Sequence, residues 1–460
     1  MTASLTLIRP GPEGLEIFLT RRRVDRSFLP GFSAFFAGKI EAEDRQGGGD
    51  QETIARRAAL REMGEEAGIS VSSDWLPRLH AFGWWRAPHW MHPYLTAFFG
   101  LLLTAAEGSA LENLAATLDP REFSGGGWMP ATEVLRRWRH PAAGELLLLT
   151  EPLVTIIEAL AKDQRLPEVP VLGDAPETPG TALSLEFSDG ITMLPLRSPT
   201  LPPATHTNAV ILGRRRLLIV DPGAASDEAM APLMEHLRHR LAAGACLEGI
   251  FLTHHHVDHI SGVAPLLREF AVPVLAHART LDLLPTRPPT ARELRDDEPL
   301  PHVDLTAVTC LHTPGHAPGH LALHLPDRGL LIAGDLVAAE GTIIIDPPQG
   351  HMGSYLSSLR RARALRPQAI LPAHGQLIAD ADATLKRYLD HRLHREALVA
   401  AALESRGFAS PEELIPLVYP EIPRAVWPLA CRSLLAHLLH LEEQGRATRA
   451  GADEVFVCPA

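Results

Sequence analysis

Four potential metal ligands stand within six residues near the middle of the chain. The run 253–259 reads T-H-H-H-V-D-H, which is H-x-H-x-D-H when counted from His254. Imidazole and carboxylate groups are the ligands that zinc and its first-row neighbours prefer. Because side chains alternate along an extended segment, we expect His254, His256 and Asp258 to face one side, with His259 on the next turn.

Three more ligands follow at wide spacing, namely His316 in H-T-P-G-H, Asp335 in L-I-A-G-D and His374 in L-P-A-H-G. Each adjoins glycine or proline, which allow the sharp turns that a close approach to a site needs. Seven ligands are too many for one zinc ion, so we expect two ions. The first would take His254, His256 and His316, the second would take Asp258, His259 and His374, and Asp335 would bridge them.

Short apolar segments precede these ligands and must hold them in place. The stretch 250–253 reads I-F-L-T and predicts a buried strand that ends at the first cluster. The other ligands also follow short apolar runs. Residues 229–241 and 354–365 have the character of helices and alternate with the apolar runs, as in a layered α/β fold.

This arrangement resembles the metallo-β-lactamase superfamily. The matching motifs are Asp221-Pro222-Gly223, the run from His254, and then His316, Asp335 and His374, all in the family's order. The resemblance implies an αββα sandwich over residues 183–382 with two Zn²⁺, or Fe or Mn, that activate a hydroxide for hydrolysis. It also implies a catalytic role for Asp258, which would orient the nucleophile as well as bind metal. We expect His312, His320 and His255 to lie outside the ligand set.

The N-terminal part has a second cluster of possible ligands. On a helix, Glu62, Glu65 and Glu66 lie at i, i+3 and i+4 and therefore share one face. Hard oxygen ligands grouped in this way suit Mg²⁺ or Mn²⁺ bound together with a phosphate substrate. The alternative is a solvated acidic face with no ligand.

The stretch 61–69, R-E-M-G-E-E-A-G-I, is similar to the core of the Nudix box, and residues 38–44 resemble its upstream start. The sequence departs from this box in three ways. Asp44 stands where glutamate is usual, and Ala37 stands where a second glycine is common. The interval between Asp44 and Arg61, residues 45–60, is nine residues longer than in the usual box. Coenzyme A diphosphatase-like proteins form a similar branch with an insertion here. The resemblance implies an α/β domain whose diphosphatase activity stays open, because a non-catalytic nucleotide-sensing module is an alternative.

The C-terminal part predicts a small winged-helix-like helical domain. Residues 385–404 and 425–444 read as helices, Ser410-Pro411 is a good helix start, and 446–457 could form a hairpin around Gly451. Segments 390–396 and 436–446 resemble the tail of the β-lactamase-like protein 2 group, some of which are endoribonucleases acting on single-stranded RNA. The last helix is not strongly basic, so we expect it to pack or to cover substrate and not to read bases.

Length and composition agree with several domains. We place a Nudix-like domain at 1–165, a Pro-rich linker at 166–182, a metallo-β-lactamase domain at 183–382 and the winged-helix-like domain at 383–460. Hydrophobic content of 46% and charged content of 21% are typical of a soluble globular protein, and no run is long enough to span a membrane. Four dispersed cysteines and an N-terminus without signal-peptide character favour a reduced, cytoplasmic protein. The formal charge of −12 argues against broad binding of a phosphate backbone.

The sequence is compatible with more than one type of hydrolysed bond. A thioester or related ester, such as an acyl-CoA, is the first reading, similar to the glyoxalase II branch, and it implies a small-molecule substrate. Single-stranded RNA is the alternative that the C-terminal tail favours. A bridging Asp335 argues against a true β-lactamase, since well-known lactamase branches lack an aspartate there.

Overall fold

The computed structural model describes residues 1–87, 94–142, 145–173, 184–300, 303–305, 307–450 and 455–458. By its internal contacts the chain divides into unit 1, Met1–Pro195, and unit 2, Leu196–Ala460. Each unit is described here by itself. The domain boundaries expected at residues 165, 182 and 382 remain a prediction. None of the helices in the described ranges is long and apolar enough to cross a membrane.

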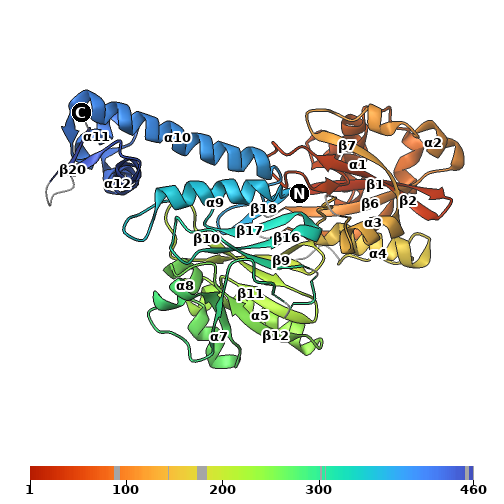
Figure 1. Ribbon diagram of the computed structural model, residues 1–460. Coiled ribbons are helices and arrows are strands. Elements are labelled where there is room, and N and C mark those ends of the chain that lie inside the picture. Colours follow the sequence, from red (N-terminus) through yellow and green to blue (C-terminus); the bar gives the residue numbers. More distant parts are fainter. Residues whose placement is uncertain are drawn as a thin grey trace. The chain divides into compact units, whose positions relative to one another are not determined.

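Unit 1 is a mixed β-sheet with helices on both faces (Figure 1). The sheet order is β3-β2-β1-β6-β5, with β4 and β7 paired to β1 and β2. Its strands are β1 Thr2–Gly11, β2 Gly14–Arg22, β3 Ser33–Ala34, β4 Phe36–Lys39, β5 His80–Arg86, β6 Leu95–Leu102 and β7 Phe123–Pro130. Its helices are α1 Gln51–Ala67, α2 Ala105–Ala110, α3 Ala131–Arg139 and α4 Glu151–Asp163, with 3₁₀ turns at Glu43–Arg45, Ser73–Arg78 and Leu114–Ala116.

Alternation along the strands supplies a core on each face of this sheet. Leu5 and Leu7 of β1 pack with α1, whereas Ile8 packs with α3 and α4. Helix α1 begins at Asp50, whose side chain accepts the Thr53 N–H, and ends at a left-handed glycine. It therefore starts within residues 45–60, the interval that is nine residues longer than usual, and it carries the three glutamates.

The predicted linker lies only partly in the described ranges, because residues 174–183 fall outside them. The Leu172 N–H donates to the Phe82 carbonyl over 2.8 Å, and the Trp84 N–H donates to the Gly173 carbonyl over 2.8 Å. This first part of the linker therefore runs along β5 and is bound within unit 1.

Two sheets form the centre of unit 2 and lie between α9 and α5 (Figure 1). One has the order β14-β13-β12-β11-β10, from Ala291–Leu294, Val274–His277, Cys246–Phe251, Arg216–Val220 and His206–Leu212. The other has the order β15-β16-β17-β18, from Thr309–His312, Leu321–Leu325, Leu330–Gly334 and Ala369–Pro372. The hairpin of β8, Leu185–Ser188, and β9, Ile191–Arg197, contains the division between the units. The helices are α5 Asp227–Ala242, α6 Val257–Ile260, α7 Val263–Glu269, α8 Ala278–Asp282 and α9 Met352–Ala364, with a 3₁₀ turn at Pro326–Arg328.

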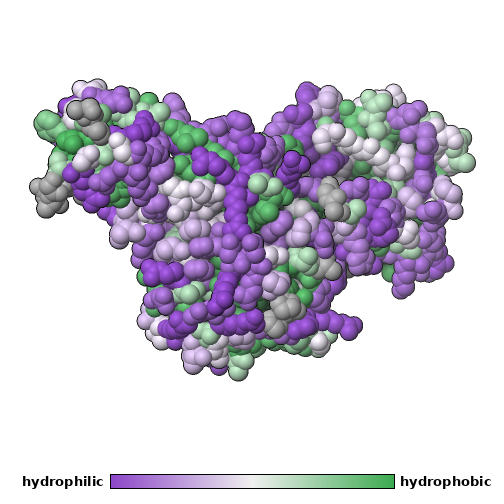
Figure 2. Space-filling model, in the orientation of Figure 1, coloured by the Kyte–Doolittle hydropathy of each residue, from purple (hydrophilic) through white to green (hydrophobic). Residues whose placement is uncertain are grey.

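The C-terminal part of unit 2 is helical with a small sheet. It comprises α10 Ala381–Arg406, β19 Phe408–Ala409, α11 Pro411–Val418, a 3₁₀ turn at Arg424–Val426, α12 Trp427–Glu443, β20 Thr448–Ala450 and β21 Val455–Val457. Helix α11 starts at Ser410-Pro411, as the sequence predicts, and Ser410 and Glu413 also form a reciprocal capping box there. The hairpin pairs as expected, but its turn at Gly451 lies outside the described residues. Figure 2 shows hydrophobic residues on this end of unit 2, where Phe408 and Leu417 are exposed.

The predicted fold class is confirmed. The chain is a multidomain α/β protein with a helix-covered mixed sheet in unit 1, two central sheets in unit 2 and a C-terminal helical part with a small sheet.

Candidate metal centre

The seven predicted ligands follow strand ends that meet at one edge of the paired sheets. His254 comes three residues after β12, His316 follows β15, Asp335 follows β17 directly and His374 follows β18. Strands β11, β12 and β13 run parallel, as do β17 and β18, so their carboxyl ends lie at a common edge. The loops after these strands can therefore converge, although they are far apart in the sequence.

The first expected group of ligands comes together closely. His256 Nδ1 lies 3.0 Å from His254 Nε2 and 2.8 Å from His316 Nε2, and the last two atoms are 3.3 Å apart. His316 Nδ1 donates to the Ile344 carbonyl over 2.7 Å, which leaves the lone pair of Nε2 facing the group. Burial, and then nearby imidazoles including His316, lower the pKa of His256 to about 2, so its ring is neutral.

Thr253 fixes the tautomer of His254. Its hydroxyl donates to Asp221 Oδ2 over 2.6 Å, so at 3.0 Å it accepts a hydrogen bond from His254 Nδ1. The lone pair of His254 Nε2 then points at the same position as those of the other two rings. Burial lowers the pKa of this fully buried imidazole well below its ordinary value. Three converging imidazole nitrogens are a suitable ligand set for a divalent ion.

The second expected group also comes together, but not through an extended segment. The chain leaves the extended conformation at His256, which caps the short helix α6, and that helix carries Asp258 and His259. The prediction that Asp258 faces the same side as His254 along a strand is therefore wrong. The helical turn instead places Asp258 and His259 with His374, and one ligand atom of each lies within 4.8 Å of the others.

Backbone and carboxylate partners orient both imidazoles of this second group. His259 Nδ1 donates to Asp221 Oδ2 over 2.8 Å, and His374 Nδ1 donates to the His206 carbonyl over 2.9 Å. Burial lowers the pKa of His259, but Asp221, Asp258 and Asp335 outweigh it and raise the value to about 10. The surrounding negative charge thus favours a cation at this position, either a proton or a metal ion.

Asp335 lies between the two groups. Its Oδ2 is 3.3 Å from His316 Nε2, whereas its Oδ1 is 3.4 Å from His374 Nε2 and 3.6 Å from His259 Nε2. Both Asp335 Oδ1 and His259 Nε2 are buried without a hydrogen-bond partner in the described part of the chain. Buried polar atoms are normally satisfied, so this set of histidine and aspartate donors fits divalent metal binding.

The three histidines expected outside the ligand set occupy supporting positions. His320 is fully buried and accepts the Asp335 N–H over 3.0 Å, so it orients the bridging position. His255 Nε2 lies 2.7 Å from the Gln349 side-chain oxygen, and the His312 ring stacks on His277 at 4.3 Å between centroids.

Asp221 has a role that the sequence reasoning did not assign. It is buried and accepts hydrogen bonds from the Thr253 N–H, the Thr253 hydroxyl and the His259 ring. It therefore supports both groups of ligands from one carboxylate. Its position after an apolar strand, in Asp-Pro-Gly, is the signal that could have suggested this role. Gly223 lets the chain pass close by, since a Cβ there would stand 1.6 Å from the Asp258 carbonyl oxygen.

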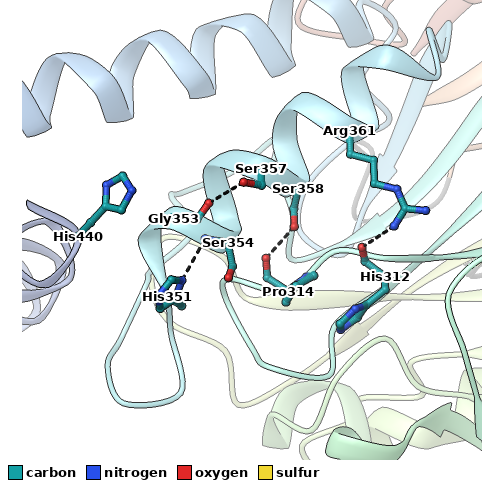
Figure 3. A pocket seen from close by; sticks show the side chains of 9 residues that line it. All are labelled: His312, Pro314, His351, Gly353, Ser354, Ser357, Ser358, Arg361 and His440. Atoms are coloured by element: carbon teal, nitrogen blue, oxygen red, sulfur yellow. Dashed lines mark hydrogen bonds between the residues drawn. The ribbon is translucent and has the colours of Figure 1, made fainter. Parts of the chain in front are cut away.

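A polar groove of about 590 Å³ runs along α9 beside the His316 loop (Figure 3). It is lined by His312, Pro314, His351, Gly353, Ser354, Ser357, Ser358, Arg361 and His440. One arginine and two histidines of this lining are each paired with a carboxylate. Arg361 lies 2.7 Å from Asp296, His351 lies 2.7 Å from Glu443, and His440 lies 2.6 Å from Glu396. The groove therefore offers hydrogen bonds without an excess of positive charge.

The three glutamates of unit 1 lie on α1 as expected, but two of them pair with an arginine. Arg61 is within 3.2 Å of Glu62 and Glu65 and within 3.0 Å of the buried Asp44. Glu65 is exposed, whereas burial raises the pKa of Glu66 to about 8. Asp44 therefore pairs with Arg61 although its side chain is shorter than that of the glutamate usual at this position.

A cavity of about 450 Å³ adjoins these carboxylates in unit 1. Its lining combines six aromatic residues, among them Phe28, Trp85 and Tyr94, with three basic side chains, namely Arg22, Arg26 and Lys39. Gly38 also lines it, and a Cβ there would stand 1.9 Å from the Glu62 carboxyl carbon. The cavity therefore opens beside the acidic face of α1.

Three family models match the chain. The metallo-beta-lactamase superfamily model matches residues 202–374, the NUDIX domain model matches 2–149, and the beta-lactamase associated winged helix domain model matches 410–454. The three domain types predicted from the sequence are thus confirmed in the predicted order.

Known relatives agree with these matches. A beta-lactamase-like protein 2 homolog of Drosophila melanogaster is 29% identical over 269 residues, which are 55% of this chain and 88% of the relative. An atrochrysone carboxyl ACP thioesterase of Aspergillus chevalieri is 28% identical over 243 residues, which are 51% of this chain and 74% of the relative. The crystal structure of a beta-lactamase domain protein from Burkholderia ambifaria is 23% identical, with a TM-score of 0.53 over 62% of this chain and 96% of that chain, and supports the fold.

The chain is therefore a hydrolase with a metallo-beta-lactamase domain, which follows a NUDIX domain and precedes a beta-lactamase associated winged helix domain.

Proposed function

We propose that this hydrolase uses two divalent metal ions to cleave a thioester or a related ester of a small molecule, such as an acyl-CoA. The observation that carries the proposal is the convergence of two ligand groups on Asp335, one oxygen of which faces each group. Two ions in such a site supply Lewis acidity and lower the pKa of a water molecule held between them. The ligands are His254, His256, Asp258, His259, His316, Asp335 and His374.

The protein's own groups have separable roles in this proposal. The tautomers of His316, His374 and His259 are set before any ion binds. Their Nδ1–H groups donate, in that order, to the Ile344 carbonyl, the His206 carbonyl and the Asp221 carboxylate. The Asp258 carboxylate lies at the same position with one oxygen 3.5 Å from His374 Nε2. It can bind an ion and accept a hydrogen bond from the attacking water, which would orient that water toward the substrate carbonyl carbon.

Two observations favour a thioester. The relative from Aspergillus chevalieri is named as an ACP thioesterase, although its similarity covers only part of this chain. The cationic groups of the α9 groove are paired with carboxylates, which leaves little positive charge for a phosphate backbone. An endoribonuclease acting on single-stranded RNA is the alternative, supported by the similarity to a beta-lactamase-like protein 2 homolog and by the winged helix domain.

The test is a hydrolysis panel on the metal-replete full chain with acyl-CoA thioesters, lactones and labelled single-stranded RNA. We expect thioester turnover that His256→Ala abolishes while circular dichroism stays unchanged, because one ligand of an assembled site is lost. His236→Ala is the matched control, since this histidine lies on α5 outside the ligand set. Cleavage of RNA alone, lost in the same variant, would replace the thioester with the alternative substrate.

We propose as a second function that the NUDIX domain binds a nucleotide-containing diphosphate together with Mg²⁺ or Mn²⁺. The aromatic and basic cavity beside Glu62, Glu65 and Glu66 favours it, because rings can stack on a base and cations can neutralise phosphate. Whether the domain cleaves the ligand or only senses it is a separate outcome of the same test.

Calorimetry on the full chain with coenzyme A, ADP-ribose and NADH, with and without Mg²⁺, checks this second proposal. We expect Mg²⁺-dependent binding of one of them, weakened by Glu65→Gln. Glu133→Gln, on α3, is the control. If no compound binds in either condition, the glutamates form only an acidic surface.

A further inference from the structure

The segment that follows Asp335, residues 336–351, connects the ligand positions to the C-terminal helices. On its inner side, the Ile344 carbonyl accepts the hydrogen bond from His316 Nδ1 over 2.7 Å. The His351 N–H donates to the Gly315 carbonyl over 2.7 Å, next to the same histidine. The orientation of His316 therefore depends on where this segment lies.

Helix α10 holds the same segment from its outer side. The Tyr388 hydroxyl exchanges hydrogen bonds of 3.0 Å with both the N–H and the carbonyl of Ala338. One turn further along the helix, the Arg392 guanidinium donates to the Ile343 carbonyl. That carbonyl belongs to the residue directly before Ile344, so Arg392 and His316 bind adjacent carbonyl groups of one short stretch.

The burial of Arg392 is costly and calls for a structural role. Its side chain is 4% exposed and its guanidinium lies 5.4 Å from the centre of the Tyr355 ring, which is itself fully buried. Its Nε has no hydrogen-bond partner in the described part of the chain. A buried guanidinium has lost its hydration, so the contacts that remain to it must offset that loss.

We propose that Arg392 is a positioning residue for the first group of ligands, His254, His256 and His316. Arg392 fixes the position of the Ile343 carbonyl and thereby that of the adjacent Ile344 carbonyl. The Ile344 carbonyl holds the His316 ring so that its Nε2 faces His256 and Asp335. The inference rests on the proposed two-metal function. It assigns to the C-terminal helices a specific task, which is to set the affinity of one metal position.

The test is metal titration of the full chain in competition with a chromogenic chelator, using Zn²⁺ and Co²⁺. The variants His316→Ala and His374→Ala identify which binding step belongs to which ligand group. We expect Arg392→Met to weaken the His316-dependent step by about 10-fold, the lower end of the range for losing a direct partner of a ligand, because Arg392 acts one carbonyl away from His316; the His374-dependent step should stay unchanged.

Arg395→Met is the matched control. Arg395 lies on the same helix and its guanidinium lies 4.7 Å from a tyrosine ring, but it donates to Val418 and Glu421 of the winged-helix part. It should leave both steps unchanged. Arg392→Lys keeps a cation that can still donate to Ile343, so it should restore part of the lost affinity and serves if Arg392→Met does not fold.

The inference is overturned if the Arg392 variants bind both ions as the wild type does, or if they weaken both steps equally, as general destabilisation would. A wild-type chain that binds a single ion, or none, would contradict the proposed function itself, and the inference would fall with it.

Discussion

The candidate metal centre of unit 2 and the acidic face of unit 1 are both clusters of potential metal ligands. They differ in whether an arginine of the protein balances the negative charge of the carboxylates. In unit 1, Arg61 is within 3.2 Å of both Glu62 and Glu65, so the protein supplies its own cation. In unit 2, the charge partners of Asp335 among the described residues are His259, His316 and His374, which are cations only when protonated, and the buried Asp335 Oδ1 and His259 Nε2 have no hydrogen-bond partner there.

This difference indicates which cluster depends on an added cation. Carboxylates that pair with an arginine can remain stable without metal, and a metal ion must compete with that arginine to bind. A buried donor set without such a partner is stabilised mainly by what binds to it. We therefore expect chelation to affect unit 2 far more than unit 1.

Asp335→Ala should have the largest effect, because one carboxylate faces both ligand groups. We expect metal content to fall from about two equivalents to below one, and turnover to fall at least about 1,000-fold, roughly 4 kcal/mol in the barrier. Elemental analysis and steady-state rates measure this. Asp390→Ala removes an exposed aspartate that pairs with Lys386 and should change neither quantity. Two equivalents retained without Asp335 would rule out the bridge.

Asp221→Asn should have an intermediate and selective effect. The amide oxygen replaces only one of the two carboxylate oxygens, so at least one of the three hydrogen bonds from Thr253 and His259 is lost, and the negative charge beside the His259 ring is removed in either orientation. We expect the His374-dependent metal step to weaken by about 10- to 100-fold, and the other step to weaken less. Asp304→Asn, which removes a carboxylate bonded to the Arg214 and Arg215 N–H groups, is the control. Equal weakening of both steps would contradict a role centred on His259.

Glu66→Gln should have the smallest effect and should appear as a change in pH dependence. The pKa of Glu66 is raised by burial from 4.5 to about 8, so the folded protein keeps a proton that the unfolded chain releases. This contribution to stability is complete below pH 4.5 and is lost as the pH rises through about 8. The wild type should therefore lose stability relative to Glu66→Gln across this range, on the order of 1–2 kcal/mol because solvent access reduces the effect.

Tryptophan fluorescence can follow this change in the full chain, since Trp75, Trp84, Trp85, Trp90, Trp128 and Trp138 belong to unit 1 and only Trp427 belongs to unit 2. Urea unfolding at pH 5 and pH 8 without metal compares the two proteins, and added Mg²⁺ should reduce their difference by favouring the ionised glutamate. Parallel pH profiles of wild type and variant would show that Glu66 is ionised throughout.

The sequence by itself determined the types of ligand, their order and the elements that carry them. Apolar runs that end at a histidine or aspartate predicted the strand ends, and Ser410-Pro411 predicted the start of α11, because both signals depend on neighbouring residues. Local sequence also placed Glu62, Glu65 and Glu66 on one helical face, since helix periodicity needs no tertiary contact.

Only the tertiary structure decided what each group contacts. Asp258 does not face the same side as His254 along a strand, because the chain enters helix α6 after His256. Alternation along a strand could not predict that change of conformation. The Ile344 carbonyl and Arg392 meet near His316 through packing of α10 against a distant segment, and backbone carbonyls carry no sequence signature. Ligand types can be read from local sequence because they are side-chain properties. Tautomers, pairing with Arg61 and the shared position of Asp335 follow from distances between remote residues, which only the folded chain sets.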